Sequence, residues 1–229
     1  TVRPWSQNGW LADLDVLLAD WDGWDNLSGA ALADARQVDD TAYMLPYGGY
    51  GISVFYRSDM LADAGYDAPP TTWDEMLEMA QAIHNPAEGR IGYALRGGRN
   101  GFSNVILALE AYNAPYLDLE NTFLQKDGKS TLFTAPNALA ALETYFELPK
   151  VSGADAINWG YPEMVEAFTN GSTAFLLQDP EVIAMVQASE SVPQDGWNTA
   201  PMLLGPDGKT IRFLGNAGWG VIEQSANKE

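Results

Sequence analysis

The sequence predicts an α/β protein, because segments with the pattern of strands alternate along the chain with segments that have the pattern of amphipathic helices. Residues 73–83 follow a Thr72–Glu75 capping box and place their apolar side chains on one helical face. Residues 172–177, STAFLL, contain a short apolar run and are typical of a buried strand. Apolar residues make up 46% of the 229 residues, which is enough for a substantial core.

Two helices are expected before any strand. Apolar residues recur at helical spacing over residues 10–21, which predicts a helix with a core-facing stripe of Trp10, Leu14, Leu17 and Trp21. A second helix is predicted from 28 to 38, and Ser28 is its expected N-cap.

The segment LPYGGYG, residues 45–51, is predicted to form a turn that enters a strand at 52–56. Its glycines precede the strand, which is the reverse of the order in a phosphate-binding loop, so a nucleotide site is excluded. A plain turn at Gly48 and Gly49 and a hinge between two lobes both remain open from the residues alone.

The middle of the chain continues the alternation. A helix capped by Ser58 and ended by Gly65 is predicted first, followed by the helix 73–83. A strand from residue 90 is predicted to end in the glycine-rich loop GGRNG, before a helix at 102–113. A strand is then predicted after the turn Asp127-Gly128, and a helix at 136–148 with Pro136 in its first turn.

The last third predicts a helix at 161–171 that Gly171 closes and a strand at 172–177. The next helix is expected to start with Asp179 as N-cap and Pro180 at its first position. Two strands around the turn Asp207-Gly208 and a final strand at 217–222 complete the pattern.

Composition excludes several classes of function. The chain has 12 Lys and Arg against 31 Asp and Glu, and a net charge of −19 repels nucleic acid and anionic lipid. The absence of cysteine excludes disulfides, thiolate metal sites and a cysteine nucleophile. The one histidine, His84, is expected at a helix end, and the segment DWDGWDN departs from the order of a calcium loop. No catalytic residue, metal or cofactor is therefore expected.

Aromatic, amide and charged residues recur at the ends of the predicted elements. Aromatic faces stack on the C–H faces of sugar rings, while amides, carboxylates and guanidinium groups bind hydroxyls. The residues with this placement are Tyr47, Tyr50, Arg99, Asn100, Asn104, Trp159, Tyr161, Gln178, Asp179, Asn216 and Trp219. Several follow strands, where ligands of open α/β sheets bind, so a polyhydroxylated ligand is predicted. A core position is the alternative for Trp159 and for Trp219.

Three segments resemble the family of extracellular solute-binding proteins of sugar ABC importers, to which the maltose-binding proteins belong. LPYGGYGISVFYRSDMLADAGYDAPPTTWDEM is similar to a family signature, with Arg57 where asparagine is commoner. FTNGSTAFLLQDP is similar to a second family segment, with Phe175 in a methionine position. GNAGWGVIEQSANKE is similar to a later strand and turn of the family.

The resemblance implies a type II periplasmic binding fold, in which two lobes are joined by hinge crossovers and hold the ligand in the cleft between them. By this resemblance, residues 1–50 form the end of the first lobe's opening section and the hinge. Residues 51–212 form the second lobe, and residues 213–229 return toward the first lobe. The chain is therefore expected to be partial and to contain mostly the second lobe.

The resemblance also implies a role without a reaction: capture of a sugar, oligosaccharide or polyol and its delivery to the permease subunits of an ABC importer. A monomer in the periplasm, or anchored at the outer face of a membrane, is expected. Tyr50 falls at a cleft residue of the family, and Arg99 and Asn100 fall in a ligand-contacting loop. Glu181 stands where maltose-binding protein has tryptophan, which argues against malto-oligosaccharides as the ligand.

Two other classes of function remain open. A carbohydrate-active hydrolase would use a pair of Asp or Glu residues, although no pair among the 31 acids is marked by its surroundings. A ligand-binding sensor domain could use the same fold as the importer component.

Overall fold

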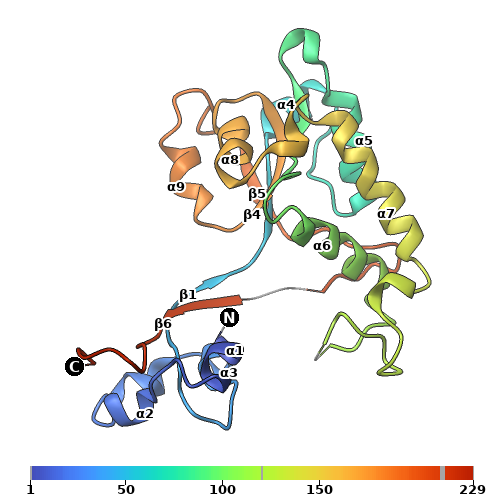
Figure 1. The fold of residues 1–229 in the computed structure, drawn as a ribbon. Coiled ribbons are helices and arrows are strands. Elements are labelled where there is room, and N and C mark those ends of the chain that lie inside the picture. Colours follow the sequence, from blue (N-terminus) through green and yellow to red (C-terminus); the bar gives the residue numbers. More distant parts are fainter. Residues whose placement is uncertain (1, 120, 212–214, 229) are drawn as a thin grey trace. The chain divides into compact units, whose positions relative to one another are not determined.

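The computed structural model describes residues 2–119, 121–211 and 215–228, and it confirms the α/β class. Within these residues the chain divides into two compact units. The smaller unit contains residues 2–51 and 215–228, and the larger unit contains residues 52–211. Figure 1 shows the helices and strands of each unit. The assignment of these segments to two lobes of a binding protein stays a prediction.

The smaller unit is built on a two-stranded antiparallel sheet. Its strands pair Leu45 with Trp219 at one end and Tyr50 with Gly215 at the other. Its elements are α1 (Val2–Gln7), α2 (Leu14–Leu17), a 3-10 helix (Asp22–Asn26), α3 (Gly29–Ala35), β1 (Leu45–Tyr50) and β6 (Gly215–Trp219). Ser28 caps α3 as predicted, because its hydroxyl accepts the Ala31 N–H at 3.2 Å.

The predicted helix over 10–21 is wrong. The helix α2 has four residues, because the Asp13 carboxylate accepts the Asp15 N–H at 2.8 Å and starts the helix only at Leu14. Of the predicted stripe only Leu14 is buried, and the side chains of Trp10, Leu17 and Trp21 are exposed. Helical spacing of apolar residues therefore did not indicate a core face in this segment.

The glycine-containing segment 45–51 forms strand β1 rather than the predicted turn. Gly48 pairs with Ala217 and Gly49 with Asn216 in the ladder to β6, and an irregularity in register lies between Pro46 and Gly48. The final strand β6 begins two residues earlier than the predicted start at residue 217.

The larger unit contains a mixed four-stranded sheet in the order β3-β4-β2-β5. Strand β4 runs parallel to β3 and antiparallel to β2, and β2 is antiparallel to β5. Its elements are β2 (Ser53–Tyr56), α4 (Ser58–Asp63), α5 (Trp73–Ile83), β3 (Ile91–Tyr93), α6 (Phe102–Asn113), α7 (Ala138–Glu147), α8 (Tyr161–Thr169), β4 (Thr173–Gln178), α9 (Val182–Gln187) and β5 (Asn198–Ala200), with short 3-10 helices at Pro86–Glu88, Leu132–Thr134, Leu148–Val151 and Ala156–Asn158.

Helices cover both faces of this sheet, as Figure 1 shows. Alternate side chains of the central strands enter two different cores. Val54, Phe175 and Leu177 pack with α5, α6 and α7, while Phe55 and Leu176 pack with α8 and α9. All six residues of β4 are buried, which explains its continuous apolar run.

Several helix starts and ends that were predicted from capping residues and glycines agree with the structure. The Thr72–Glu75 capping box is confirmed, because each side chain binds the other residue's backbone N–H at 3.2 Å. Gly65 and Gly171 have φ angles of +87° and +84°, as expected for residues that end helices. Helix α6 covers the predicted residues 102–113.

Four expectations about element ends are wrong. Helix α9 starts after Glu181, so Asp179 is not its N-cap. The Asp127-Gly128 turn leads into a 3-10 helix rather than a strand, and Pro136 precedes the N-cap of α7. The turn at Gly208 is followed by no strand among residues 209–211, and the rest of that predicted strand lies outside the described residues.

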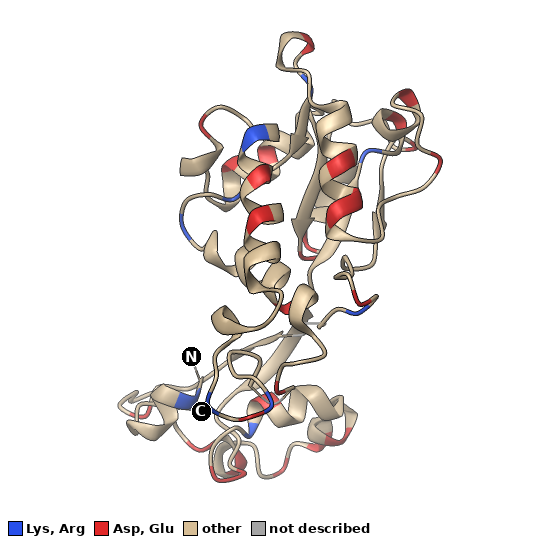
Figure 2. Cartoon of the chain, turned by 90° about the vertical axis from the view of Figure 1, so that its right-hand side faces the viewer, with Lys and Arg blue, Asp and Glu red and all other residues tan. Residues whose placement is uncertain are grey.

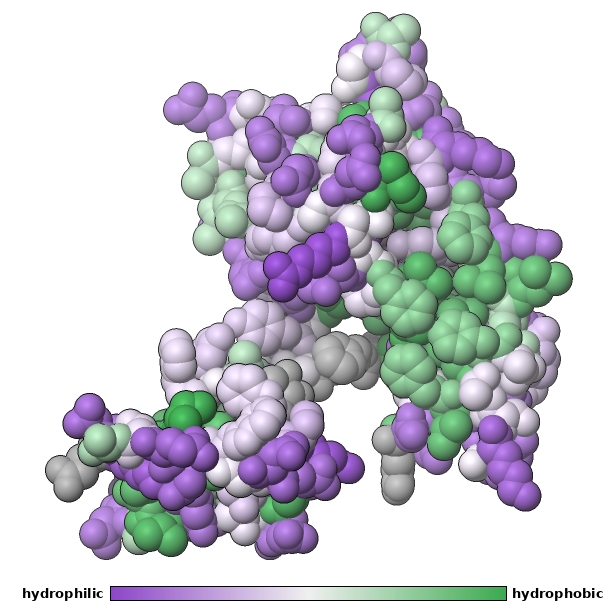
Figure 3. Space-filling view, viewed as in Figure 1, coloured by the Kyte–Doolittle hydropathy of each residue, from purple (hydrophilic) through white to green (hydrophobic). Residues whose placement is uncertain are grey.

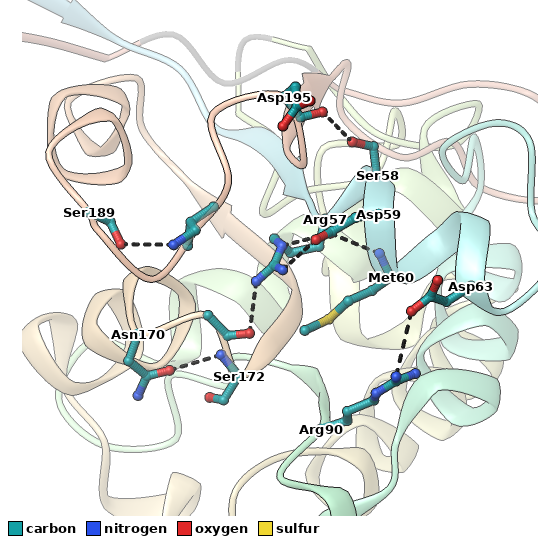
Figure 4. Close-up of polar contacts among 12 residues, drawn as sticks. Arg57, Ser58, Asp59, Met60, Asp63, Arg90, Asn170, Ser172, Ser189 and Asp195 are labelled. Atoms are coloured by element: carbon teal, nitrogen blue, oxygen red, sulfur yellow. Dashed lines mark hydrogen bonds and ion pairs between the residues drawn. The ribbon is translucent and has the colours of Figure 1, made fainter.

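The buried Arg57 side chain forms an ion pair with the partly exposed Asp59 and joins the start of α4 to the turn before β4, as Figure 4 shows. The Arg57 guanidinium donates to both carboxylate oxygens of Asp59, at 2.8 and 2.6 Å, and to the carbonyl of Gly171 at 2.8 Å. Only 7% of the Arg57 side chain is exposed. Burial opposes ionisation of Asp59, but the hydrogen bonds and charge of Arg57 outweigh it, and the pKa of Asp59 lies below its ordinary value.

Replacement of this carboxylate should destabilise the larger unit. We expect Asp59→Asn to lower the free energy of unfolding by about 2 kcal/mol at neutral pH, because it leaves a buried guanidinium charge uncompensated. A depressed carboxyl pKa stabilises the fold above the unfolded value of about 4, and this contribution is lost as the pH falls through the folded pKa. The difference in the free energy of unfolding between wild type and Asp59→Asn, measured by urea unfolding, should therefore become smaller in acid.

Asp63→Asn is the matched control, since Asp63 is 64% exposed and pairs with Arg90 at 3.5 Å. It should change the free energy of unfolding by less than about 0.5 kcal/mol. Equal stability of Asp59→Asn and wild type at neutral pH would contradict a stabilising role for the Arg57–Asp59 ion pair.

Candidate functional site

The predicted site residues fall into two groups, one in each unit, and each group is described by itself. The smaller unit carries Tyr47, Tyr50, Asn216 and Trp219 on its two strands. The larger unit carries Arg99, Asn100, Trp159, Tyr161, Gln178, Asp179 and Glu181.

The strands β1 and β6 present an exposed aromatic surface. The rings of Tyr47 and Trp219 lie 5.5 Å apart between centroids, at 33° to each other. They are 58% and 71% exposed, so Trp219 is not the core residue that was its alternative interpretation. The hydroxyls of Tyr47 and Tyr50 lie 3.3 Å apart, which brings three predicted residues together.

Asn216 is held by an acidic side chain of helix α3. Its Nδ2 donates to the Asp34 carboxylate at 2.6 Å, and its backbone N–H donates to the same oxygen at 3.3 Å. Both residues line a hollow of 540 Å³ within the smaller unit, together with apolar side chains such as Trp5. The Asn216 amide is thus already engaged, and its clearest role is to fix β6 against α3.

In the larger unit, two parallel strands deliver polar residues to one edge of the sheet. Strands β3 and β4 are parallel neighbours, so their carboxyl ends lie at the same edge. The glycine-rich loop 96–101 follows β3, and Gln178, Asp179 and Glu181 stand at or after the end of β4. This edge is where ligands bind in α/β sheets.

Close backbone contacts hold the glycine-rich loop in place. The Gly97 N–H donates to the Ala156 carbonyl at 3.1 Å, and the Gly98 N–H donates to the Trp159 carbonyl at 2.9 Å. A Cβ atom on Gly98 would lie 2.6 Å from the Asn158 carbonyl oxygen. The loop therefore packs on residues 156–159 at a distance that only glycine allows.

Arg99 and Asn100 are exposed at the tip of this loop. Asn100 has a φ angle of +65°, a conformation that asparagine tolerates better than most residues. Its carbonyl accepts the Ser103 N–H at 3.2 Å and the Ser103 hydroxyl at 2.8 Å, which joins the loop to the first turn of α6. The two side chains are thus presented to solvent by a fixed backbone.

Tyr161, Asp179 and Glu181 form a charged cluster where α8 begins and β4 ends. Burial and the hydrogen-bonding carboxylate of Glu181 raise the pKa of Tyr161 to about 12. Burial, and then the charge of Glu181, raise the pKa of Asp179, while Arg96 opposes this rise. The cluster offers carboxylate acceptors and a phenol that stays protonated at neutral pH, a set that binds hydroxyl groups.

Arg96 belongs to this cluster and was missed from the sequence. Its Nε donates to the Arg99 carbonyl at 2.9 Å, and its guanidinium carbon lies 5.9 Å from the centre of the Tyr161 ring. The available signal was its position in RIGYALRGG, directly before the glycines at the end of the predicted strand. The pattern gave no reason to prefer it over Arg99.

Gln178 and Trp159 support the cluster from below the surface. Gln178 is only 4% exposed, and its Oε1 accepts the Asp179 N–H at 2.8 Å, which orders the strand end. Trp159 is half-buried, and a Cβ atom on Gly153 would lie 2.5 Å from its ring. Both residues lie at the predicted edge of the sheet, but much of each side chain is used in packing.

An exposed aromatic pair that was also missed begins helix α6. The rings of Phe102 and Phe133 stack with centroids 6.2 Å apart and an interplanar angle of 25°. They are 59% and 47% exposed, and Figure 3 shows apolar side chains gathered over this part of the larger unit. Exposure at the start of an amphipathic helix could not be read from its apolar residues alone.

The surface charges suit a small uncharged or cationic ligand better than a polyanion. Figure 2 shows acidic residues spread over the helices with few basic residues between them. Among the described residues, no group of three or more acidic or histidine side chains converges as a metal site. In the same part of the chain, no helix is long and apolar enough to cross a membrane.

Comparison with known proteins identifies relatives over the whole chain. The family model described as bacterial extracellular solute-binding protein matches residues 1–229. A probable ABC transporter-binding protein of Deinococcus radiodurans is 28% identical over 187 residues, which cover 76% of this chain and 41% of that protein. A mannitol-binding protein of Pseudomonas aeruginosa is 32% identical over 111 residues, which cover 48% of this chain and 25% of that protein.

Solved structures confirm the predicted fold. The maltose-bound T. maritima MalE3 has a TM-score of 0.82 and 25% identity, with coverage of 96% of this chain and 55% of that chain. A solute-binding protein of Agrobacterium vitis with bound D-mannitol has a TM-score of 0.77 at 24% identity, with coverage of 98% and 54%. The chain spans less than half the length of the two curated relatives and about half that of these structures.

Gly98→Ala should disturb the site because the loop has no room for a methyl group. We expect the free energy of unfolding to fall by about 1–3 kcal/mol, since the contacted atoms belong to the backbone and must move. Gly29→Ala is the control: nothing lies within 4 Å of its added Cβ, and it starts helix α3. Thermal unfolding of both variants tests this, and equal stability of Gly98→Ala and wild type would show that the loop is not tightly packed.

Proposed function

The chain belongs to the bacterial extracellular solute-binding protein family, and from this premise we propose that it captures a sugar, oligosaccharide or polyol for an ABC importer. The observation that carries the proposal is the cluster of Tyr161, Asp179 and Glu181 at the carboxyl ends of the parallel strands in the larger unit. Carboxylates accept hydrogen bonds from ligand hydroxyls, and a neutral phenol can donate to them. The family is one of transporter binding proteins, which are not enzymes.

The aromatic surface of the smaller unit supports a carbohydrate as the ligand. Tyr47 and Trp219 expose adjacent ring faces, which can cover the C–H face of a sugar. The ligands bound in similar structures include maltose, D-mannitol, ribitol and alpha-D-tagatose, each bound by its own protein. A polyhydroxylated compound of this size suits the mixture of aromatic and charged groups in this chain.

The same premise supports the proposed partners and location. The smaller unit corresponds to part of a first lobe and the larger unit to a second lobe, and the ligand-bound protein is recognised by permease subunits. A periplasmic or extracellular location, with or without a membrane anchor, is typical of the family. Monomeric function without nucleic acid is consistent with the net charge of −19.

A calorimetric titration of the full-length protein tests this proposal. The panel is maltose, laminaribiose, D-mannitol, ribitol and D-tagatose. Saturable binding of at least one member is expected, because hydroxyl-rich ligands match the carboxylate acceptors and the phenol donor of the cluster in the larger unit. Chromatography after the titration should recover the ligand unchanged.

Failure of all five ligands to bind would contradict the proposed ligand class. Release of a cleaved product, abolished by one Asp or Glu substitution, would instead favour the carbohydrate-active hydrolase.

Tyr50→Ala should weaken binding of the tightest panel ligand by about 1–3 kcal/mol, the usual cost of removing a half-buried aromatic ring with its contacts. Tyr66→Ala, which removes a half-buried tyrosine packed on the core of the larger unit, is the control. It should leave the affinity within about twofold of wild type, since Tyr66 lies outside both groups. Unchanged affinity in Tyr50→Ala would remove Tyr50 from the site.

A further inference from the structure

Arg96 occupies a central position among the predicted site residues of the larger unit. It lies three residues after the end of β3, at the edge of the sheet where β4 also ends. Its Nε–H donates to the Arg99 carbonyl at 2.9 Å, which closes the loop 96–99. A guanidinium has five N–H donors, so the four on the terminal nitrogens lie outside this contact.

The guanidinium also contacts the aromatic member of the cluster. Its central carbon lies 5.9 Å from the centre of the Tyr161 ring, within the range of a cation–π interaction. Tyr161 is the first residue of α8, so one side chain joins the glycine-rich loop to the start of that helix. A loss of Arg96 would remove one side-chain contact of the loop and one of the ring.

Arg96 balances the negative charge of the cluster. The charges of Glu181, at the same strand end, and of Arg96, after the end of β3, both act on Asp179. Glu181 also hydrogen-bonds with the Tyr161 hydroxyl at the start of α8. Burial and Glu181 both disfavour the charged form of Asp179, and Arg96 favours it. Without Arg96, two carboxylates and a half-buried phenol would share the edge of the sheet with no cation acting on Asp179 among the described residues.

We propose that Arg96 is the positioning residue of this site: its guanidinium orders the Arg99 end of the glycine-rich loop and the Tyr161 ring, and it supplies the positive charge of a cluster whose carboxylates accept ligand hydroxyls. This inference rests on the proposed function, because it assigns a role within the same site. It adds a residue that none of the sequence patterns singled out.

The role predicts a specific pH dependence. Binding that needs the Asp179 carboxylate weakens as the pH falls through the pKa of Asp179. Removal of Arg96 raises that pKa further, because burial and Glu181 then act unopposed. The acid limb of the binding curve should therefore move to higher pH, which a residue with a purely structural role would not cause.

The test compares Arg96→Gln, Arg96→Lys and wild type in the full-length protein. The probe is the member of the five-ligand panel that wild type binds most tightly, titrated by calorimetry across a range of pH. The carboxyl carbon of Asp179 is followed by NMR in the ligand-free proteins and assigned with Asp179→Asn. Arg90→Gln is the matched control, since the Arg90 side chain is 39% exposed and pairs only with the exposed Asp63 and Glu88 in the described residues.

We expect Arg96→Gln to bind about tenfold or more weakly at neutral pH, because a charge-assisted contact is lost. The pH at the midpoint of the Asp179 titration, followed by NMR, should rise in this variant. Arg96→Lys should keep the midpoint close to wild type but bind more weakly, because an ammonium lacks the planar fork of a guanidinium. Arg90→Gln should change neither quantity.

Wild-type affinity in Arg96→Gln, or an Asp179 midpoint equal to that of wild type, would overturn the inference. If wild type binds no member of the panel, the proposed function fails, and the Asp179 midpoint alone decides the inference. In that case an unchanged midpoint in Arg96→Gln overturns it, and a raised midpoint supports the charge balance by Arg96.

Discussion

The complete burial of strand β4 is the constraint on which the larger unit depends. All six of its residues are buried, so the strand needs neighbours on both sides in the sheet and helices on both faces. Strands β2 and β3 satisfy its backbone groups, and α5 to α7 and α8 to α9 cover the two faces. The two polar residues of β4, Thr173 and Gln178, stand at its ends and are themselves buried, so exposed polar side chains can follow only where the strand ends.

That end is where the candidate site lies. Gln178 is still buried and uses its amide oxygen to fix the Asp179 backbone, so the first carboxylate emerges at a defined position. The parallel strand β3 ends at the same edge and supplies Arg96 through a loop that packs too closely for any residue but glycine at position 98. The same arrangement that buries the core therefore places opposite charges and Tyr161 together at its rim.

Local chemistry made much of this fold predictable. The capping box of Thr72 and Glu75 and the apolar run of β4 depend on neighbouring residues only, and both were read from the sequence. The start of α9 was not, because the helix begins after Glu181, and the Asp179 carboxylate interacts with the charges of Glu181 and of the distant Arg96 instead of capping the helix. Arg96 was missed for the same reason: its importance comes from Tyr161 and Asp179, which are more than 60 residues away in the chain.

The most direct measurement of the account is a crystal structure of the full-length protein with its tightest panel ligand. Ligand hydroxyls are expected within hydrogen-bonding distance of the Asp179 carboxylate and the Tyr161 phenol, with an intact ligand. A ligand bound elsewhere, with neither of these side chains in contact, would contradict the assignment of the site to the strand ends of the larger unit.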